Sequence, residues 1–203
     1  TRVLTTATAD FRIYTTNRDT IRANRAAVDS FVANVNRLFD RAVIPIPEHV
    51  TIDAAAATAA ADVVQLDVIM AQINAAHASI NREQAAADGA RAAAVGSMDA
   101  ARIDQYNTTL VDIGARVAVA KAIMDREGGV LARLLNASNQ QTVNARAIIT
   151  RVIAKKAVYD THDTNIAIHH QIIAIRDTGQ VGFARIGPLI RAANAKTERL
   201  NRL

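Results

Sequence analysis

Apolar side chains that recur at alternating three- and four-residue steps are the feature that most restricts the fold of this chain. Between residues 103 and 124 the pattern runs without interruption through Ile103, Tyr106, Leu110, Ile113, Val117, Ala120 and Met124. This heptad spacing places all seven side chains along one stripe of an α-helix and favours packing against a second helix. We therefore predict an all-α fold.

The composition indicates how such helices would pack. Half of the 203 residues are hydrophobic, but only 3% are aromatic and there is no tryptophan. A core of Ala, Ile, Val and Leu has thin layers, which suits helices that lie close together side by side. The expected fold is an elongated helical bundle of four to five helices.

Breaks in the apolar pattern predict where these helices begin and end. Pro45 and Pro47 cannot continue a helix, and the Gly128-Gly129 pair is expected to stop the helix before it. A further break is expected between Gly89 and Gly96, followed by Ser97 or Asp99 as a cap. Pro188 suits the first turn of a last helix. The expected helices are 17–43, 51–88, 97–127, 130–177 and 188–202, with little or no sheet.

The N-terminal segment differs in composition from the rest. The stretch "TRVLTTATADFRIYT" is rich in Thr and β-branched residues, which favour extended structure. Thr16 and Asp19 have the spacing of a helix-capping box. We therefore expect an extended N-terminal arm over residues 1–16, a helical bundle core over 17–177, and a basic loop and C-terminal helix over 178–203.

Three of the five histidines lie in the stretch "DTHDTNIAIHHQ", residues 160–171. If this stretch is helical, His162 and His169 are seven residues apart, about 10.5 Å along the axis. One metal ion cannot bind two ligands at that separation, because zinc–nitrogen distances are near 2 Å. We interpret the histidines as part of a polar or inter-subunit face, with Asp160 or Asp163 capping a helix, and we predict no metal site.

Other chemical motifs are few. The chain has no cysteine and four serines, and it lacks the glycine-rich phosphate-binding and nucleophile-elbow patterns. Asp62, Asp67, Glu83 and Asp88 are interpreted as a solvated helix face. We expect a protein that is not an enzyme and has no cofactor. We recognise no signal peptide and no apolar run long enough to span a membrane.

The charge is distributed unevenly along the chain. The formal net charge is +5, with basic residues in excess over 1–41 and 151–203 and acids in excess over 42–100. Arginine supplies most of the basic residues, a bias that a GC-rich genome would also produce. Basic ends and an acidic centre permit head-to-tail pairing of copies as readily as binding to a polyanion.

Several basic side chains recur at helical spacing. Arg18, Arg22 and Arg25 would form one stripe of the first helix, and Arg151 and Lys155 are four residues apart. Stripes of this kind bind phosphate backbones irrespective of sequence, and the scarcity of aromatic residues argues against base stacking. The candidate phosphate-binding residues are Arg18, Arg22, Arg25, Arg151, Lys155, Arg185, Arg191, Arg199 and Arg202.

These observations favour a non-enzymatic structural protein that self-assembles into a homopolymer of the filament or coat (nucleocapsid) type. Its expected partners are copies of itself and, through sequence-indifferent arginine contacts, an RNA or DNA backbone. Its expected setting is then a virion or an extracellular filament. The alternative is a helical-bundle interaction or sensor module that acts through a coiled-coil seam.

Overall fold

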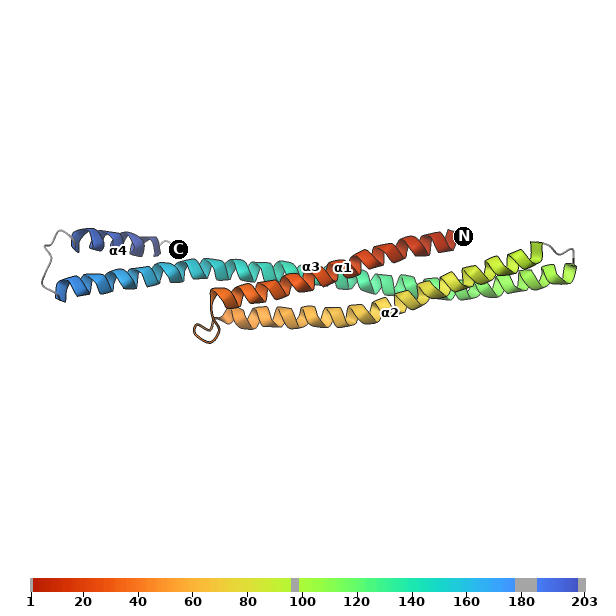
Figure 1. Cartoon of the computed structure of the whole chain (residues 1–203), viewed down its shortest axis with the longest axis horizontal. Coiled ribbons are helices and arrows are strands. Elements are labelled where there is room, and N and C mark those ends of the chain that lie inside the picture. The colour runs from red at the N-terminus through yellow and green to blue at the C-terminus, as the bar shows by residue number, and fades with distance from the viewer. Residues whose placement is uncertain (1, 96–98, 178–185, 201–203) are drawn as a thin grey trace. The chain divides into compact units, whose positions relative to one another are not determined.

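The computed structural model describes residues 2–95, 99–177 and 186–200, and these residues form four α-helices and no strand (Figure 1). The helices are α1 (Arg2–Leu38), α2 (Pro47–Val95), α3 (Ala100–Asp177) and α4 (Ile186–Leu200). The prediction of an all-α helical bundle is confirmed.

The chain divides into two compact units whose borders differ from the predicted domains. Unit 1 comprises Thr1–Val32 and Ile52–Ala145, and unit 2 comprises Ala33–Thr51 and Arg146–Leu203. All three borders fall within helices, namely within α1, α2 and α3.

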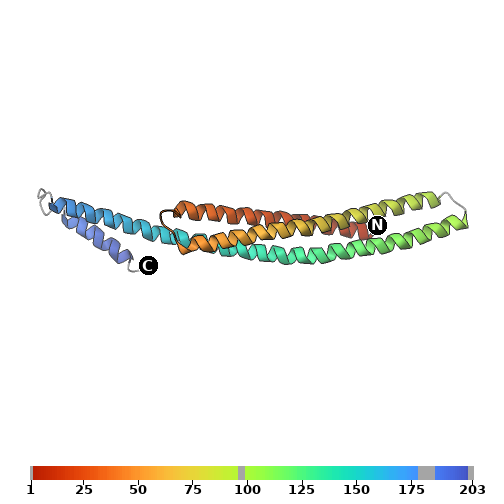
Figure 2. The same cartoon turned by 90° about the horizontal axis from the view of Figure 1, so that it is seen from below.

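Unit 1 is a three-helix arrangement in which α1 packs along the α2–α3 pair (Figures 1 and 2). One core cluster joins Ile21 of α1 to Leu66 and Ile73 of α2 and to Leu131 of α3. Leu66 and Ile73 are seven residues apart, so both lie on one stripe of α2. The bulk of the hydrophobic burial therefore follows from helical periodicity.

A second cluster in unit 1 contains the small residues that bring the helices together. Ala7, Ala76 and Ala120 are buried there beside Ile80 and Met124. Alanine at each helix surface lets neighbouring backbones approach closely, as the composition predicts.

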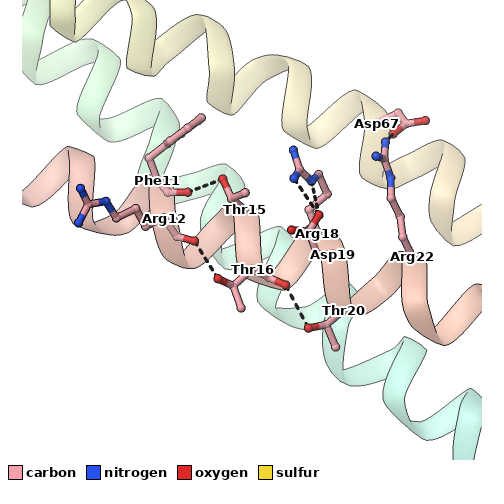
Figure 3. A network of polar contacts seen from close by, with 9 residues as sticks. All are labelled: Phe11, Arg12, Thr15, Thr16, Arg18, Asp19, Thr20, Arg22 and Asp67. Atoms are coloured by element: carbon pink, nitrogen blue, oxygen red, sulfur yellow. Dashed lines mark hydrogen bonds and ion pairs between the residues drawn. The ribbon is translucent and has the colours of Figure 1, made fainter.

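The prediction of an extended arm over residues 1–16 is wrong, because α1 begins at Arg2. Threonine hydroxyls in this segment donate back to carbonyl oxygens four residues earlier, as from Thr16 to Arg12 at 3.1 Å (Figure 3). Thr16 is therefore inside the helix and caps nothing. Burial of Ala7 and packing of Phe11 against both clusters stabilise the helix despite its β-branched residues.

The predicted helix break at Gly128-Gly129 is also wrong, because α3 continues through both residues. An added Cβ at Gly128 would collide with the Tyr14 ring, whereas one at Gly129 would meet nothing within 4 Å. Gly128 thus makes room for an α1 side chain. Buried Met124 and Leu131 hold the helix on either side of the pair, which outweighs a propensity cost of about 1 kcal/mol per glycine.

The other helix ends follow the sequence more closely. Asp99 caps α3 by accepting a hydrogen bond from the Ala101 N–H at 3.0 Å, as expected. α2 continues through Gly89 to Val95, and Pro188 lies in the first turn of α4. Ser97, the other candidate cap, lies outside the described residues.

In unit 2, a buried histidine holds the connection between α1 and α2. The Ile46 N–H donates to His49 Nδ1 at 3.2 Å, so Nε2 carries the ring proton and donates to the Phe39 carbonyl at 3.0 Å. Phe39 packs edge-on against Tyr159 of α3, with ring centroids 5.8 Å apart. The turn is therefore fixed on both sides by a neutral imidazole.

Candidate assembly and polyanion-binding surfaces

The three arginines predicted to form a stripe do lie together on α1, but their guanidinium groups have partners within the chain. Figure 3 shows Arg18 paired with the adjacent Asp19 at 2.7 Å and Arg22 reaching across to Asp67 of α2 at 2.9 Å. Asp67 belongs to the acidic 42–100 segment, so part of that acidity is neutralised within one copy.

Arg25 completes this stripe and is held by two contacts. Its Nε donates to Asp29 at 2.8 Å, and its Nη1 donates to the Ala56 carbonyl of α2 at 3.2 Å. The spacing of the arginines is readable from the sequence. Their partners are not, because Ala56 and Asp67 lie 31 and 45 residues away along the chain.

In unit 2, Lys155 of α3 is also engaged. Its ammonium group donates to both carboxylate oxygens of Glu48, at 2.7 and 2.8 Å. That hydrogen bond, followed by smaller effects that include the nearby charge of Arg151, lowers the pKa of Glu48 below its usual range. Sequence reasoning missed Glu48, which is 107 residues from its partner.

Three of the candidate basic residues make no ion pair with any described residue. Arg151 on α3 and Arg191 and Arg199 on α4 are exposed to solvent. Arg185 and Arg202 lie outside the described residues. Arg151, Arg191 and Arg199 are therefore the candidates whose guanidinium groups are unpaired among the described residues.

The histidine-rich stretch 160–171 is helical and lies within α3, so Asp160 and Asp163 are interior positions and cap nothing. Asp160 instead pairs with Lys156 one turn earlier. His162, His169 and His170 are at or near the surface. Over 2–95, 99–177 and 186–200, no group of three or more His, Asp or Glu side chains is arranged to hold a metal ion.

The acids predicted to form a solvated face on α2 have separate surroundings. Glu83 pairs with Arg116 of α3 at 3.0 Å, and Asp88 accepts a hydrogen bond from Gln84 at 3.0 Å. Asp62 is half-buried, its Oδ2 has no hydrogen-bond partner among the described residues, and burial raises its pKa. These carboxylates are arranged as individual contacts and not as a paired site.

A polar cluster joins α1 to α3 next to Gly128. Lys121 pairs with Asp10 at 3.2 Å and with Asp125, and hydrogen bonding to Asp125 is the main reason that the pKa of Lys121 is raised. Burial, followed by the charges of Asp10 and Asp125, raises the pKa of the Tyr14 hydroxyl. The cluster links the two helices, and one ammonium group is shared by two carboxylates.

Unit 1 has a long apolar groove between α2 and α3, with a volume of about 740 Å³. Its floor is made of small residues such as Ala75, Ala76 and Ala115, and Val119 and Ile123 line it from α3. Arg116 and Arg126 border it, although each has a carboxylate partner. The groove is therefore an open, largely apolar surface of unit 1 with charged residues at its border.

α2 is apolar enough, by length and composition, to cross a membrane, which the sequence analysis did not expect. An 18-residue window in it has a mean hydropathy of 1.4, and 22% of that window is buried inside the structure. A mostly buried core helix passes the same test, and although most of this window is exposed, Leu66 and Ile73 of α2 are core residues. Composition alone therefore does not distinguish these two environments.

The fold and these surfaces define an all-α helical protein with exposed apolar and basic helix faces. Comparisons of the chain with protein-family models, with curated proteins and with solved structures found no match.

Proposed function

We propose that this protein is a non-enzymatic structural protein that assembles with copies of itself into a homopolymer of the filament or coat type. The observation that supports this proposal is that each unit leaves an apolar helix face open. Unit 1 has the groove between α2 and α3, and unit 2 exposes Ile166 and Ile173 on α3.

Two separate apolar faces favour a polymer over a closed pair. A contact in which both copies use the same face closes after two copies, so growth requires a second contact elsewhere on the chain. Contiguous apolar surface on a soluble protein commonly marks a binding interface. Faces on different units give each copy the two contacts that continued growth needs.

Enclosure of nucleic acid is a further part of this proposal. It is supported by the exposed Arg151, Arg191 and Arg199, and more weakly by the α1 arginines, which already have carboxylate partners. Contacts of this kind bind phosphate without regard to base sequence. In an assembly, repeated copies would align these arginines along one strand.

Particle size tests the proposal directly. The purified chain, with a mass of 21.7 kDa, is studied by sedimentation velocity and negative-stain microscopy over a range of concentrations, with and without nuclease. We expect particles of many copies that grow with concentration, and nuclease-sensitive growth if nucleic acid is enclosed. A monomer at every concentration would overturn the proposal.

The alternative function is an interaction module acting through one helical seam. The exposed Ile166 and Ile173 on α3 would support this alternative equally well if that face binds a partner and the groove of unit 1 does not. A complex of fixed, small stoichiometry that does not grow with concentration would favour this alternative.

A further inference from the structure

The packing seam of α3 continues beyond the helices that cover it. In unit 2, Ile148 and Val152 face the core and are buried. Steps of seven residues from Val152 lead to Tyr159, Ile166 and Ile173, which are 39%, 41% and 45% exposed. The open part of the seam thus has the same periodicity as the covered part, and it begins where Phe39 packs against Tyr159.

α4 lies beside the same part of α3 (Figures 1 and 2). Asn165 is the buried α3 residue in this region, and Ala193 is the buried residue of α4, so each lies on a covered side of its helix. At about 100° per residue, Ile166 is turned roughly 100° from Asn165 and roughly 160° from Ile168. Among the described residues, α4 therefore leaves the Ile166 face uncovered.

The side chains along this open seam are symmetric about Ile166. Tyr159 and Ile173 lie seven residues before and after it, and His162 and His170 lie four before and after it. Asp163 and His169 lie at three residues on either side. The two histidines are identical and Tyr159 and Ile173 are both largely apolar, whereas Asp163 and His169 are chemically different. When a second copy runs in the opposite direction, the apolar positions and the histidines therefore recur at equal distances from Ile166.

From this symmetry we infer that a second copy of the chain docks antiparallel on the α3 seam, with the two-fold axis at Ile166. Ile166 then meets its counterpart, and Tyr159 lies level with the second copy's Ile173. Helical geometry places Asp163 and His170 on one flank of the seam and His162 and His169 on the other. Asp163 therefore faces the second copy's His170, and this pair occurs twice by symmetry.

Two features favour a second copy as the occupant: the polar side chains beside the seam, and the continuation of the covered seam into the open one. The Asp163 carboxylate and the His170 ring have no hydrogen-bond or ion-pair partner within the described part of the chain, and antiparallel docking supplies one for each. The overlap is limited by the α1–α2 connection, which already occupies the seam before Tyr159. This inference deepens the proposed function by naming one contact between copies, and a contact of this kind alone closes at a dimer.

The absence of cysteine allows a direct test by cross-linking in the full chain. A disulfide requires Cα atoms within about 7 Å of each other. We expect Ile166→Cys to form a covalent dimer readily on oxidation. His162→Cys and His169→Cys should each cross-link poorly alone, since equivalent positions lie roughly 9–12 Å apart along the axis. An equal mixture of those two variants should cross-link well.

A charge substitution provides a second, independent measurement. Ile166→Asp buries two carboxylates against each other at the axis, and we expect self-association through this contact to weaken by about 100-fold in sedimentation equilibrium. Ile153→Asp is the matched control, because Ile153 is exposed on α3 but lies on another side of the helix. Its self-association should remain at the wild-type level.

The outcomes separate this inference from the proposed function. Cross-linked dimers that never grow further would support the α3 contact and overturn the homopolymer. Large particles that form in Ile166→Asp, without cross-linking of Ile166→Cys, would overturn the α3 contact and leave the homopolymer intact. Cross-linking of His162→Cys alone as efficiently as the mixture would overturn the antiparallel arrangement.

Discussion

At the scale of single residues, Gly128 and Gly129 look alike in the sequence but have different surroundings. Gly128 lies against the Tyr14 ring and Gly129 faces open space. We expect Gly129→Ala to stabilise the protein by about 0.5–1 kcal/mol through helix propensity. Gly128→Ala should instead destabilise it by about 1–2 kcal/mol, because Tyr14 must leave its packed position. Urea unfolding of both variants checks this, and equal effects would contradict the Tyr14 contact.

His49 provides a second comparison at this scale. Its ring satisfies the Ile46 N–H and the Phe39 carbonyl, both from the connection that it closes. We expect His49→Ala to destabilise unit 2 by about 2–4 kcal/mol, since one buried and one partly buried backbone group lose their partners. Val50→Ala, at an exposed neighbouring position, should change stability by less than about 0.5 kcal/mol. Thermal unfolding followed by circular dichroism compares the two, and similar midpoints would argue against the role of His49.

At the scale of helices, the N-terminal half of α1 belongs to the core of unit 1. The Phe11 ring stacks on His77 of α2, with centroids 4.2 Å apart and planes 10° from parallel. We expect Phe11→Ala to cost about 2–3 kcal/mol in the free energy of unfolding, less than a fully buried phenylalanine would. Ile13→Ala is the matched control, because Ile13 is exposed on the same turn region of α1. If both variants unfold at the same urea concentration, this segment is not packed as described.

The contact between the start of α2 and α3 has a defined pH dependence. The pKa of Glu48 is lower in the folded state than in the unfolded state. The Glu48 carboxylate therefore stabilises the fold fully at pH values above its unfolded-state pKa, and this stabilisation is lost as the pH falls through its folded-state pKa. We expect Glu48→Gln to be less stable than wild type by about 1 kcal/mol at pH 7. The difference should disappear in acid, below both pKa values. A double-mutant cycle with Glu48→Gln and Lys155→Met measures the interaction energy between the two side chains. An interaction energy that does not change with pH would contradict this prediction.

For the helices, the apolar spacing could be predicted from the sequence, but the contacts between distant helices could not. The apolar stripes predicted the helices well, since burial of Ile113, Ala120 and Met124 follows directly from their spacing. Local signals misled at residues 1–16 and at Gly128, because contacts from distant helices outweigh a weak propensity there. The basic candidates were recognisable by spacing, but partners such as Glu48 and Asp67 depend on which helices become neighbours.

At the scale of the whole molecule, nucleic-acid binding should reflect which arginines are already paired. We expect the triple variant Arg151→Ala, Arg191→Ala and Arg199→Ala to bind random-sequence RNA or DNA more weakly than wild type. The slope of log K against log salt should fall in magnitude by about 2–3, if each residue neutralises one phosphate. Filter binding across salt concentrations measures both quantities.

Arg22→Ala is the control for that measurement. Because Arg22 pairs with Asp67, its loss should leave the salt slope nearly unchanged. A reduced slope in Arg22→Ala, with no change in the triple variant, would place the phosphate contacts on α1 instead. No binding of either nucleic acid at low salt would exclude enclosure of a genome and leave a bare protein assembly.

The pairing of Glu48 with Lys155 also has a consequence for synthesis of the chain. Lys155 lies 107 residues after Glu48 and emerges about 5–20 s later at ribosomal rates. During that time the α1–α2 connection has no α3 to pack against, and its apolar side chains are open to other nascent chains. The His49 hydrogen bonds close over only 10 and 3 residues, so they can form at once. If the α1–α2 connection forms its hydrogen bonds while α3 is still being translated, α1 and α2 of one chain would be held together. They would then be less available to pack against helices of another nascent chain on the same polysome.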